Sequence, residues 1–182
     1  MTAPGSESPR FVSEVLDPAR HIVDPFRCGE PGLDDWLRLH AAHAARMDTA
    51  RTFVWCDRGG ADQDIVRAYY ALSAHLIAST EVPAKIARGG PRHLPAVLLA
   101  KLALSVELRG RGLGVQLLVD ALRRVVAASQ QGPAVRVVIV DAITAAAAQF
   151  YQRFGFVPVP GNATRLVQKM SVIQAVPGIR PR

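Results

Sequence analysis

The sequence predicts one domain of mixed α/β (α+β) class, in which helices flank a mixed β-sheet. Residues 97–106 form a strand-like apolar run that passes through a glycine-rich turn into an apolar helical pattern over residues 113–128. A valine-rich run at 135–140 is followed by a second, shorter helical pattern and another apolar segment. Strands that alternate with helices in this order predict an α/β arrangement for the C-terminal half.

The N-terminal half has the pattern of a helix followed by antiparallel strands. Residues 34–47 are predicted to be helical, and residues 51–56 form a short β-rich run. A second strand is expected within 65–76, after a hairpin turn at the glycine pair 59–60. The polar segment 83–91, with two prolines and two glycines, is expected to interrupt the sheet as a loop on the substrate side.

Length and composition predict a single core. The chain has 182 residues, of which 49% are hydrophobic, and a mean hydropathy of +0.15. We expect a flexible N-terminal tail over residues 1–20, one domain over 21–173 and a C-terminal tail over 174–182. Apolar stretches end well before twenty residues and the first ten residues lack a hydrophobic signal, so a soluble, cytoplasmic protein is expected.

Positive charge is the main compositional bias. The formal net charge is +7 and the pI about 10.2, and all but three of the 22 basic side chains are arginines. Arginine suits bidentate phosphate recognition, and a cationic field would speed the capture of a polyanion. The alternative is that the arginine content reflects genomic composition.

Residues 109–114, Arg-Gly-Arg-Gly-Leu-Gly, predict an anion cradle. Alternating glycines allow a tight turn whose N–H groups point one way, and the following helix adds the positive end of its dipole. A P-loop would need Gly-Lys-Ser/Thr, but no lysine lies between Lys101 and Lys169. A dinucleotide site would need Gly-x-Gly-x-x-Gly and a carboxylate about twenty residues on, and both are missing here.

A second motif lies about forty residues further on, at 148–156. Thr144 is placed to cap a short helix, and Gly155 to end it. Phe150 and Phe154 are four residues apart and are expected to form its packed stripe. Tyr151 lies beside that stripe, so it is either a functional hydroxyl or an ordinary aromatic at the edge of the core.

Cysteine and histidine do not predict a metal site. Cys28 and Cys56 are too few for a disulfide framework and are interpreted as reduced packing residues. His40 and His43 are three residues apart on the predicted helix, but no third ligand is near them in sequence.

The motif Arg/Gln-x-x-Gly-x-Gly/Ala, present as Arg109, Gly112 and Gly114, resembles that of the GNAT acyltransferases. The resemblance implies the GNAT fold, a mixed sheet whose central strands splay apart, with acetyl-CoA as co-substrate and no metal. It places Tyr151 beside the coenzyme sulfur as the general acid. The implied coenzyme-binding residues are Leu104, Ser105, Val106, Arg109, Gly110, Arg111, Gly112, Leu113 and Gly114.

Further motifs narrow the resemblance to the GNAT toxins of bacterial toxin–antitoxin systems. They are Phe26-x-Cys28-Gly29, Leu33-Asp34-x-Trp36-Leu37, Arg51-Thr52-Phe53-Val54 and Tyr69-Tyr70-Ala71-Leu72-Ser73. The similarity spans about residues 26–170. It implies acetylation of the amino group of aminoacyl-tRNA, a ribbon-helix-helix antitoxin as partner, and a homodimer. The sequence departs from this family at Ala68, where glycine is common, and at Ser105, where aspartate is.

The resemblance also implies a mechanism. A free α-amine attacks the thioester directly, a backbone N–H near residues 104–106 polarises the carbonyl oxygen, and Tyr151 protonates the departing thiolate. Arg88 and Arg92 are candidates for a basic rim at the acceptor cleft, the alternative being a solvated loop. The remaining candidates to assist the chemistry are Glu107, Asp141 and His75.

Two other function classes stay open at this point. One is a GNAT enzyme acting on a small-molecule or protein amine, and the other is a non-catalytic module that binds acetyl-CoA or a partner. Growth arrest on expression would favour the toxin, acetylation of polyamines or aminoglycosides the first alternative, and failure to bind coenzyme the second.

Overall fold

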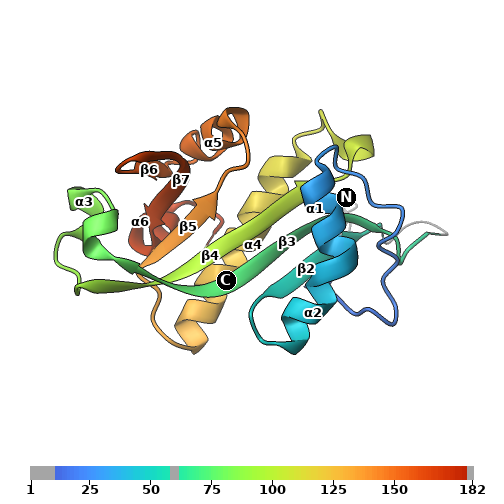
Figure 1. The fold of residues 1–182 in the computed structure, drawn as a ribbon, viewed down its shortest axis with the longest axis horizontal. Helices are drawn as coiled ribbons and strands as arrows, with labels where there is room; N and C mark the ends of the chain where they lie inside the picture. The colour runs from blue at the N-terminus through green and yellow to red at the C-terminus, as the bar shows by residue number, and fades with distance from the viewer. Residues whose placement is uncertain (1–10, 58–61, 180–182) are drawn as a thin grey trace, which may run out of the picture.

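The computed structural model describes residues 11–57 and 62–179, and within them one seven-stranded sheet has the order β1-β2-β3-β4-β5-β7-β6 (Figure 1). Only the β4–β5 pair is parallel, so the predicted mixed α/β fold is confirmed. The strands are β1 (Ser13–Val15), β2 (Arg51–Cys56), β3 (Val66–Ala78), β4 (His93–Leu104), β5 (Val137–Asp141), β6 (Val157–Val159) and β7 (Asn162–Lys169).

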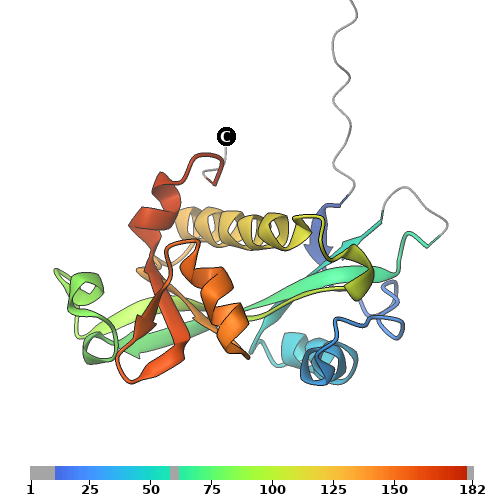
Figure 2. The ribbon, with the colours of Figure 1, turned by 90° about the horizontal axis from the view of Figure 1, so that it is seen from above.

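Helices cover both faces of this sheet (Figure 2). The longest helix, α4 (Leu113–Gln131), lies on one face together with α6 (Met170–Ala175), and α1 (Pro31–Asp35) and α2 (Ala41–Arg46) lie on the other. One π-helical turn, η1 (Trp36–His40), joins α1 to α2, so the predicted helix 34–47 forms in three consecutive pieces. The others are η2 (Ser79–Glu81), α3 (Ala84–Ala87), η3 (Val106–Leu108) and α5 (Ala145–Gln152).

Alternation along the strands divides the core in two. Phe53 and Tyr70 pack in the cluster that contains the buried face of α4. Their sequence neighbours Val54 and Tyr69 pack on the other face of the sheet, with α1 and α2. Successive strand residues point to opposite faces, so a short sequence such as Phe53-Val54 supplies both layers. The two layers fix both faces of β3 and β4, the strands beside which the site lies.

The two central strands separate at Leu99. β4 pairs with β5 only over Ala96–Leu99 and Val137–Val140. On the other side of β4, Ala71 pairs with Lys101 and Leu72 with Leu99, which leaves Ala100 as an extra, bulged residue. Residues 100–104 of β4 therefore have a paired edge toward β3 and an edge without a strand partner toward β5, as the expected splaying requires.

Several expected boundaries differ from the structure. Residues 13–15 of the expected N-terminal tail form β1, which pairs with β2, and Ile179 of the expected C-terminal tail is 3% exposed in the main core. The central strand begins at His93 and ends at Leu104, and the expected loop 83–91 contains the short helix α3. The predicted hairpin turn at 59–60 lies outside the described residues. No helix in the described part of the chain is long and apolar enough to cross a membrane.

Candidate functional site

A cavity of about 240 Å³ opens where β4 and β5 diverge. One wall is the unpaired edge of β4, and a second wall comes from the residues after β5 and from α5. A third wall comes from the turn that precedes α1. The lining residues include Cys28, Glu30, Leu33, Lys101, Leu102, Leu104, Arg109, Asp141, Thr144, Ala147 and Tyr151.

The glycine loop has the backbone geometry that an anion cradle needs. Gly110 and Gly112 have φ of +74° and +70°, which side chains disfavour, and Gly112 is the N-cap of α4 without any side-chain cap. A Cβ atom built on Gly110, Gly112 or Gly114 would have no heavy atom within 4 Å. Space beside the glycine loop is therefore open, and the first N–H groups of this 19-residue helix have no partner within the helix, as an anion site requires.

Backbone N–H groups at the end of β4 are not all available to a ligand. Ser105 donates to the Arg67 carbonyl at 2.8 Å and Val106 to the Arg27 carbonyl at 2.9 Å. Val106 also lies in η3 and not in the strand, so its N–H is already taken and does not extend the free edge of β4. Because N–H directions alternate along an antiparallel ladder, Leu104 and Leu102 present theirs toward the unpaired edge.

The side chain of Arg109 points back across the cavity wall. Its guanidinium donates a hydrogen bond to the carbonyl of Cys28, which precedes α1. The motif position therefore carries an arginine that already has a protein partner. The contact involves the side chain only, so the expected place of Arg109 among the coenzyme-binding residues stays a prediction.

Tyr151 is held in place by its helix and by two aromatic rings. Thr144 caps α5 as predicted by accepting from the Ala147 N–H at 3.1 Å. The Tyr151 ring makes edge contacts with Phe150 and Phe156, with centroids 5.3 and 5.9 Å apart, and the residue is 7% exposed. Burial raises the pKa of its hydroxyl above the ordinary value. The hydroxyl makes no hydrogen bond with any described residue and lies at the cavity.

The packed stripe of this helix is not the predicted one. The buried residues of α5 are Ala148 and Tyr151, whereas Phe154 is 37% exposed and follows the end of the helix at Gln152. Phe154 does contact Phe150, with centroids 5.1 Å apart, and Phe150 is a partly buried residue that packs against the core. Tyr151 therefore occupies the buried position of the helix that the spacing of Phe150 and Phe154 predicted for a phenylalanine.

The structure brings three residues to the cavity that sequence reasoning missed. Glu30 and Leu33 line it from the N-terminal side, and Lys101 from β4. The Lys101 ammonium lies 5.7 Å from the centroid of the Trp36 ring, which stacks on Tyr69. The motif Leu33-Asp34-x-Trp36-Leu37 was the available signal, but it was used only for the family resemblance and not to place residues at the cavity.

Arg88 and Arg92 lie away from the cavity. Arg88 follows α3 and Arg92 precedes β4, so both lie at the start of a strand whose other end lines the cavity (Figure 1). Leu99, the first residue of β4 that lines the cavity, is seven residues beyond Arg92, about 23 Å along an extended strand. Neither arginine lines the cavity itself, and their expected place on a basic rim for the acceptor stays a prediction.

The other candidate assisting groups have structural partners. Glu107 forms an ion pair with Arg67 at 2.8 Å. Asp141 lies 3.6 Å from Arg165, whose guanidinium also reaches His75 at 3.0 Å. Asp141 is the only one of these three residues among those lining the cavity in the described part of the chain. These contacts support a structural role for Glu107 and His75.

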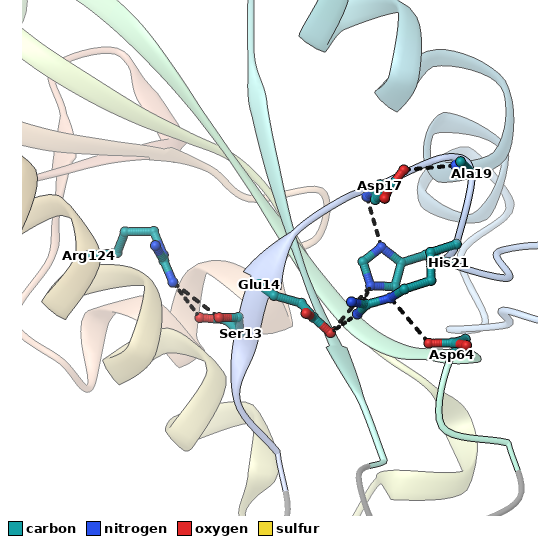
Figure 3. A network of polar contacts seen from close by, with 8 residues as sticks. Ser13, Glu14, Asp17, Ala19, His21, Asp64 and Arg124 are labelled. Atoms are coloured by element: carbon teal, nitrogen blue, oxygen red, sulfur yellow. Dashed lines mark hydrogen bonds and ion pairs between the residues drawn. The ribbon is translucent and has the colours of Figure 1, made fainter.

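Folding assembles one cluster of possible metal ligands that sequence spacing did not predict, formed by Glu14, His21 and Cys56. His21 Nδ1 accepts the Asp17 N–H at 2.8 Å, and its Nε2 lies 3.3 Å from the Glu14 carboxylate and 2.7 Å from the Arg20 guanidinium (Figure 3). Burial raises the pKa of the Cys56 thiol to about 11, and Arg20 forms an ion pair with Glu14. Glu14 and His21 thus already have protein partners on and beside β1.

Comparison with known proteins identifies the family. Residues 62–158 match the Acetyltransferase (GNAT) domain. The chain is also 34% identical over 174 residues to a tRNA-acetylating toxin of Mycobacterium tuberculosis (strain ATCC 25618 / H37Rv), with 96% of this chain and 98% of that protein covered. The chain therefore belongs to the GNAT acetyltransferase family.

Two solved structures of the AtaT toxin have the same fold. AtaT complexed with acetyl-methionyl-tRNAfMet is 26% identical, with a TM-score of 0.81 over 90% of this chain and 97% of that one. A tyrosine-to-phenylalanine mutant of AtaT bound to the C-terminus of the antitoxin AtaR and to acetyl-CoA is also 26% identical. Its TM-score is 0.76, over 91% of this chain and 96% of that one.

Proposed function

We propose that this protein is an acetyl-CoA-dependent N-acetyltransferase toxin that acetylates the α-amino group of aminoacyl-tRNA and so blocks translation. The observation that carries the proposal is the cavity between β4 and β5, which Arg109 lines beside the glycine loop and Tyr151 lines from α5. Family membership supplies the reaction class. The likeness to tRNA-acetylating relatives over nearly the whole chain supports the acceptor.

Acetyl-CoA would lie along the unpaired edge of β4. The N–H groups of Gly112, Leu113 and Gly114 suit its pyrophosphate, because they combine open space with the positive end of α4. The N–H groups of Leu102 and Leu104 suit the amide carbonyls of the pantetheine arm, which would pair with the edge as a further strand does. The thioester would then reach Tyr151.

The acceptor amine needs no strong base. An α-amine has a reference pKa of about 7.7–8.0, so a sizeable fraction is the free nucleophile at neutral pH. Its lone pair forms the new C–N bond at the thioester carbonyl, and the electrons of the C–S bond leave with the coenzyme sulfur. An N–H of the β4 edge is placed to stabilise the carbonyl oxygen while it carries charge.

Tyr151 supplies the proton that the leaving sulfur needs. Its hydroxyl gives a proton to the thiolate as the C–S bond breaks, and it recovers one from the nitrogen, which must lose a proton to become an amide. Burial keeps this hydroxyl protonated over the whole neutral range and favours its rapid reprotonation. The sum of these steps is one amide and one free thiol.

The pH dependence of the reaction is expected to have a single rising limb. The limb reports deprotonation of the acceptor amine, with an apparent pKa of about 7.7–8.0. Because burial raises the pKa of Tyr151, the acid stays protonated and no falling limb is expected below about pH 10. Short-time measurements of kcat/KM between pH 6 and 9.5 check this, and a fall in rate above pH 8 would contradict the role of Tyr151.

The charge distribution supports a polyanionic acceptor. Of the 22 Lys and Arg residues 14 lie beyond Val82, together with only three of the 15 acidic residues. Five of these cations gather near α3, the start of β4 and the end of β7, and none of them makes an ion pair among the described residues. They are Lys85, Arg88, Arg92, Arg136 and Lys169. Unpaired cations at one end of a molecule favour contact with a phosphate backbone.

Reversing charge at this end is expected to weaken tRNA capture without touching the chemistry. In the double variant Arg88→Glu/Arg92→Glu, KM for aminoacyl-tRNA should rise by about tenfold or more, and its dependence on salt should become shallower. Acetyl-CoA affinity in calorimetry should not change. The double variant Arg46→Glu/Arg51→Glu, at two exposed arginines of α2 and β2, makes the same change in net charge and should have a much smaller effect. An unchanged KM in Arg88→Glu/Arg92→Glu would remove this surface from the proposal.

The protein partners follow from the same relatives. AtaT has been solved with its antitoxin AtaR, and we propose that this chain has a neutralising antitoxin of the ribbon-helix-helix type and forms a homodimer. Light scattering of the purified chain tests the dimer. Co-expression with the product of a neighbouring gene, scored by relief of growth arrest, tests the antitoxin.

A further inference from the structure

Arg109 joins the glycine loop to the N-terminal wall of the cavity. Its guanidinium donates to the Cys28 carbonyl, and three residues earlier the Val106 N–H donates to the Arg27 carbonyl at 2.9 Å. These two bonds cross about 80 residues of sequence. They fasten the segment before α4 onto the turn before α1.

The turn and the guanidinium are fitted to one another. Gly29 has φ of +86°, and a Cβ atom built on it would lie 3.0 Å from Arg109 Nη2. The Cys28 N–H donates to the buried carboxylate of Asp34 at 2.8 Å, which fixes the peptide on the N-terminal side of Cys28, whereas Arg109 holds the peptide on its C-terminal side. The positive φ of Gly29 favours glycine, and a side chain there would press against the guanidinium.

The fastened turn is a wall of the cavity. Cys28, Glu30 and Leu33 line the cavity on this side, and Tyr151 and Thr144 line it from α5 and the segment before it. The width of the space for the acceptor depends on where the turn lies. The hydrogen bond from Arg109 to the Cys28 carbonyl helps to fix the position of this turn.

We infer that Arg109 is a positioning residue that sets the width of the acceptor side of the cavity and thereby the choice among aminoacyl groups, and that it is not the phosphate ligand its motif position suggests. This inference rests on the proposed function, since it takes an aminoacyl group as the acceptor. It predicts that loss of the guanidinium changes selectivity between acceptors more than affinity for acetyl-CoA.

The test compares Arg109→Gln and Arg109→Lys with Arg46→Gln, at an exposed arginine of α2 that does not line the cavity. Rates are measured with one tRNA body that carries either of two aminoacyl groups of different size, both accepted by the wild type, and acetyl-CoA affinity is measured by calorimetry. Arg109→Gln should change the ratio of the two kcat/KM values by about three- to tenfold, as loss of one partly exposed charge-assisted hydrogen bond would. Its Kd for acetyl-CoA should stay within about twofold of the wild type. Arg109→Lys should restore part of the ratio, and Arg46→Gln should leave it unchanged.

A Kd for acetyl-CoA that rises by about tenfold in Arg109→Gln, with an unchanged ratio, would overturn the inference and make Arg109 a phosphate ligand. Wild-type protein that acetylates no aminoacyl group of bulk charged tRNA would instead contradict the proposed function. Amide hydrogen exchange then decides the positioning role separately. The Cys28 and Val106 amides should exchange faster with solvent in Arg109→Gln than in the wild type. Unchanged exchange rates would show that Arg109 does not hold the turn before α1 in place.

Discussion

Replacing Tyr151 by phenylalanine is expected to lower kcat by about 10²–10⁴, the range for loss of one general acid. The substitution removes only the hydroxyl that faces the cavity and keeps the ring that contacts Phe150 and Phe156. Since that hydroxyl has no hydrogen bond to any described residue, its removal should leave the fold and acetyl-CoA affinity intact. Single-turnover rates, thermal unfolding and calorimetric Kd together check the prediction.

Tyr70→Phe is the matched control for the loss of a buried hydroxyl. Tyr70 is buried on the α4 side of β3, where its hydroxyl joins Ser13, Asp120 and Arg124. Removing it should cost about 1–3 kcal/mol of stability through the partners left unpaired, with little change in kcat. If Tyr151→Phe kept wild-type turnover, Tyr151 would be a packing residue and the acid would have to be sought elsewhere.

Replacing Gly112 by aspartate is expected to abolish most acetyl-CoA binding, with Kd rising by about 10²-fold or more. The new side chain would enter open space at the N-terminus of α4 and place a carboxylate beside the pyrophosphate. Juxtaposed like charges cost several kcal/mol, and each 1.4 kcal/mol is a factor of ten in Kd. Calorimetry with acetyl-CoA measures the effect directly.

Gly161→Asp separates the loss of a ligand site from backbone strain. Gly161 lies between β6 and β7, its φ is +76°, and a Cβ atom there also meets nothing within 4 Å. Both variants should lose a similar amount of stability, about 1–2 kcal/mol for a left-handed non-glycine residue. Only Gly112→Asp should lose acetyl-CoA. Equal Kd values for the two variants would show that α4 does not bind the phosphates.

Local features of this chain could be predicted because their causes lie within a few residues. Thr144 caps α5 because its hydroxyl reaches an N–H three residues on, and Gly112 turns into α4 because no other residue adopts its φ easily. The β-rich runs that contain Phe53-Val54 and Tyr69-Tyr70 predicted two strands, whereas the packing of alternate residues on opposite faces is a finding of the structure. The order of the strand-like and helical patterns along the chain predicted the mixed sheet.

The remaining features depend on contacts that are distant in sequence. The partner of Arg109 is a carbonyl 81 residues away, and the Val106 N–H is taken by Arg27, so neither group's availability could be read from its motif. The bulge at Ala100 arises from the register between two strands. Lys101 and Glu30 reach the cavity only because the sheet brings α1 beside β4.

The most direct test of the central claim is the transfer of label from acetyl-CoA to bulk aminoacylated tRNA, with wild-type protein and with Tyr151→Phe, followed by identification of the labelled amino acid. The account predicts label on the α-amino group of an aminoacyl ester with wild-type protein, and a loss of about 10²–10⁴ in rate with the variant. Acetyl-CoA that binds while no charged tRNA becomes labelled would contradict it, and would direct attention to small-molecule or protein amines as acceptors.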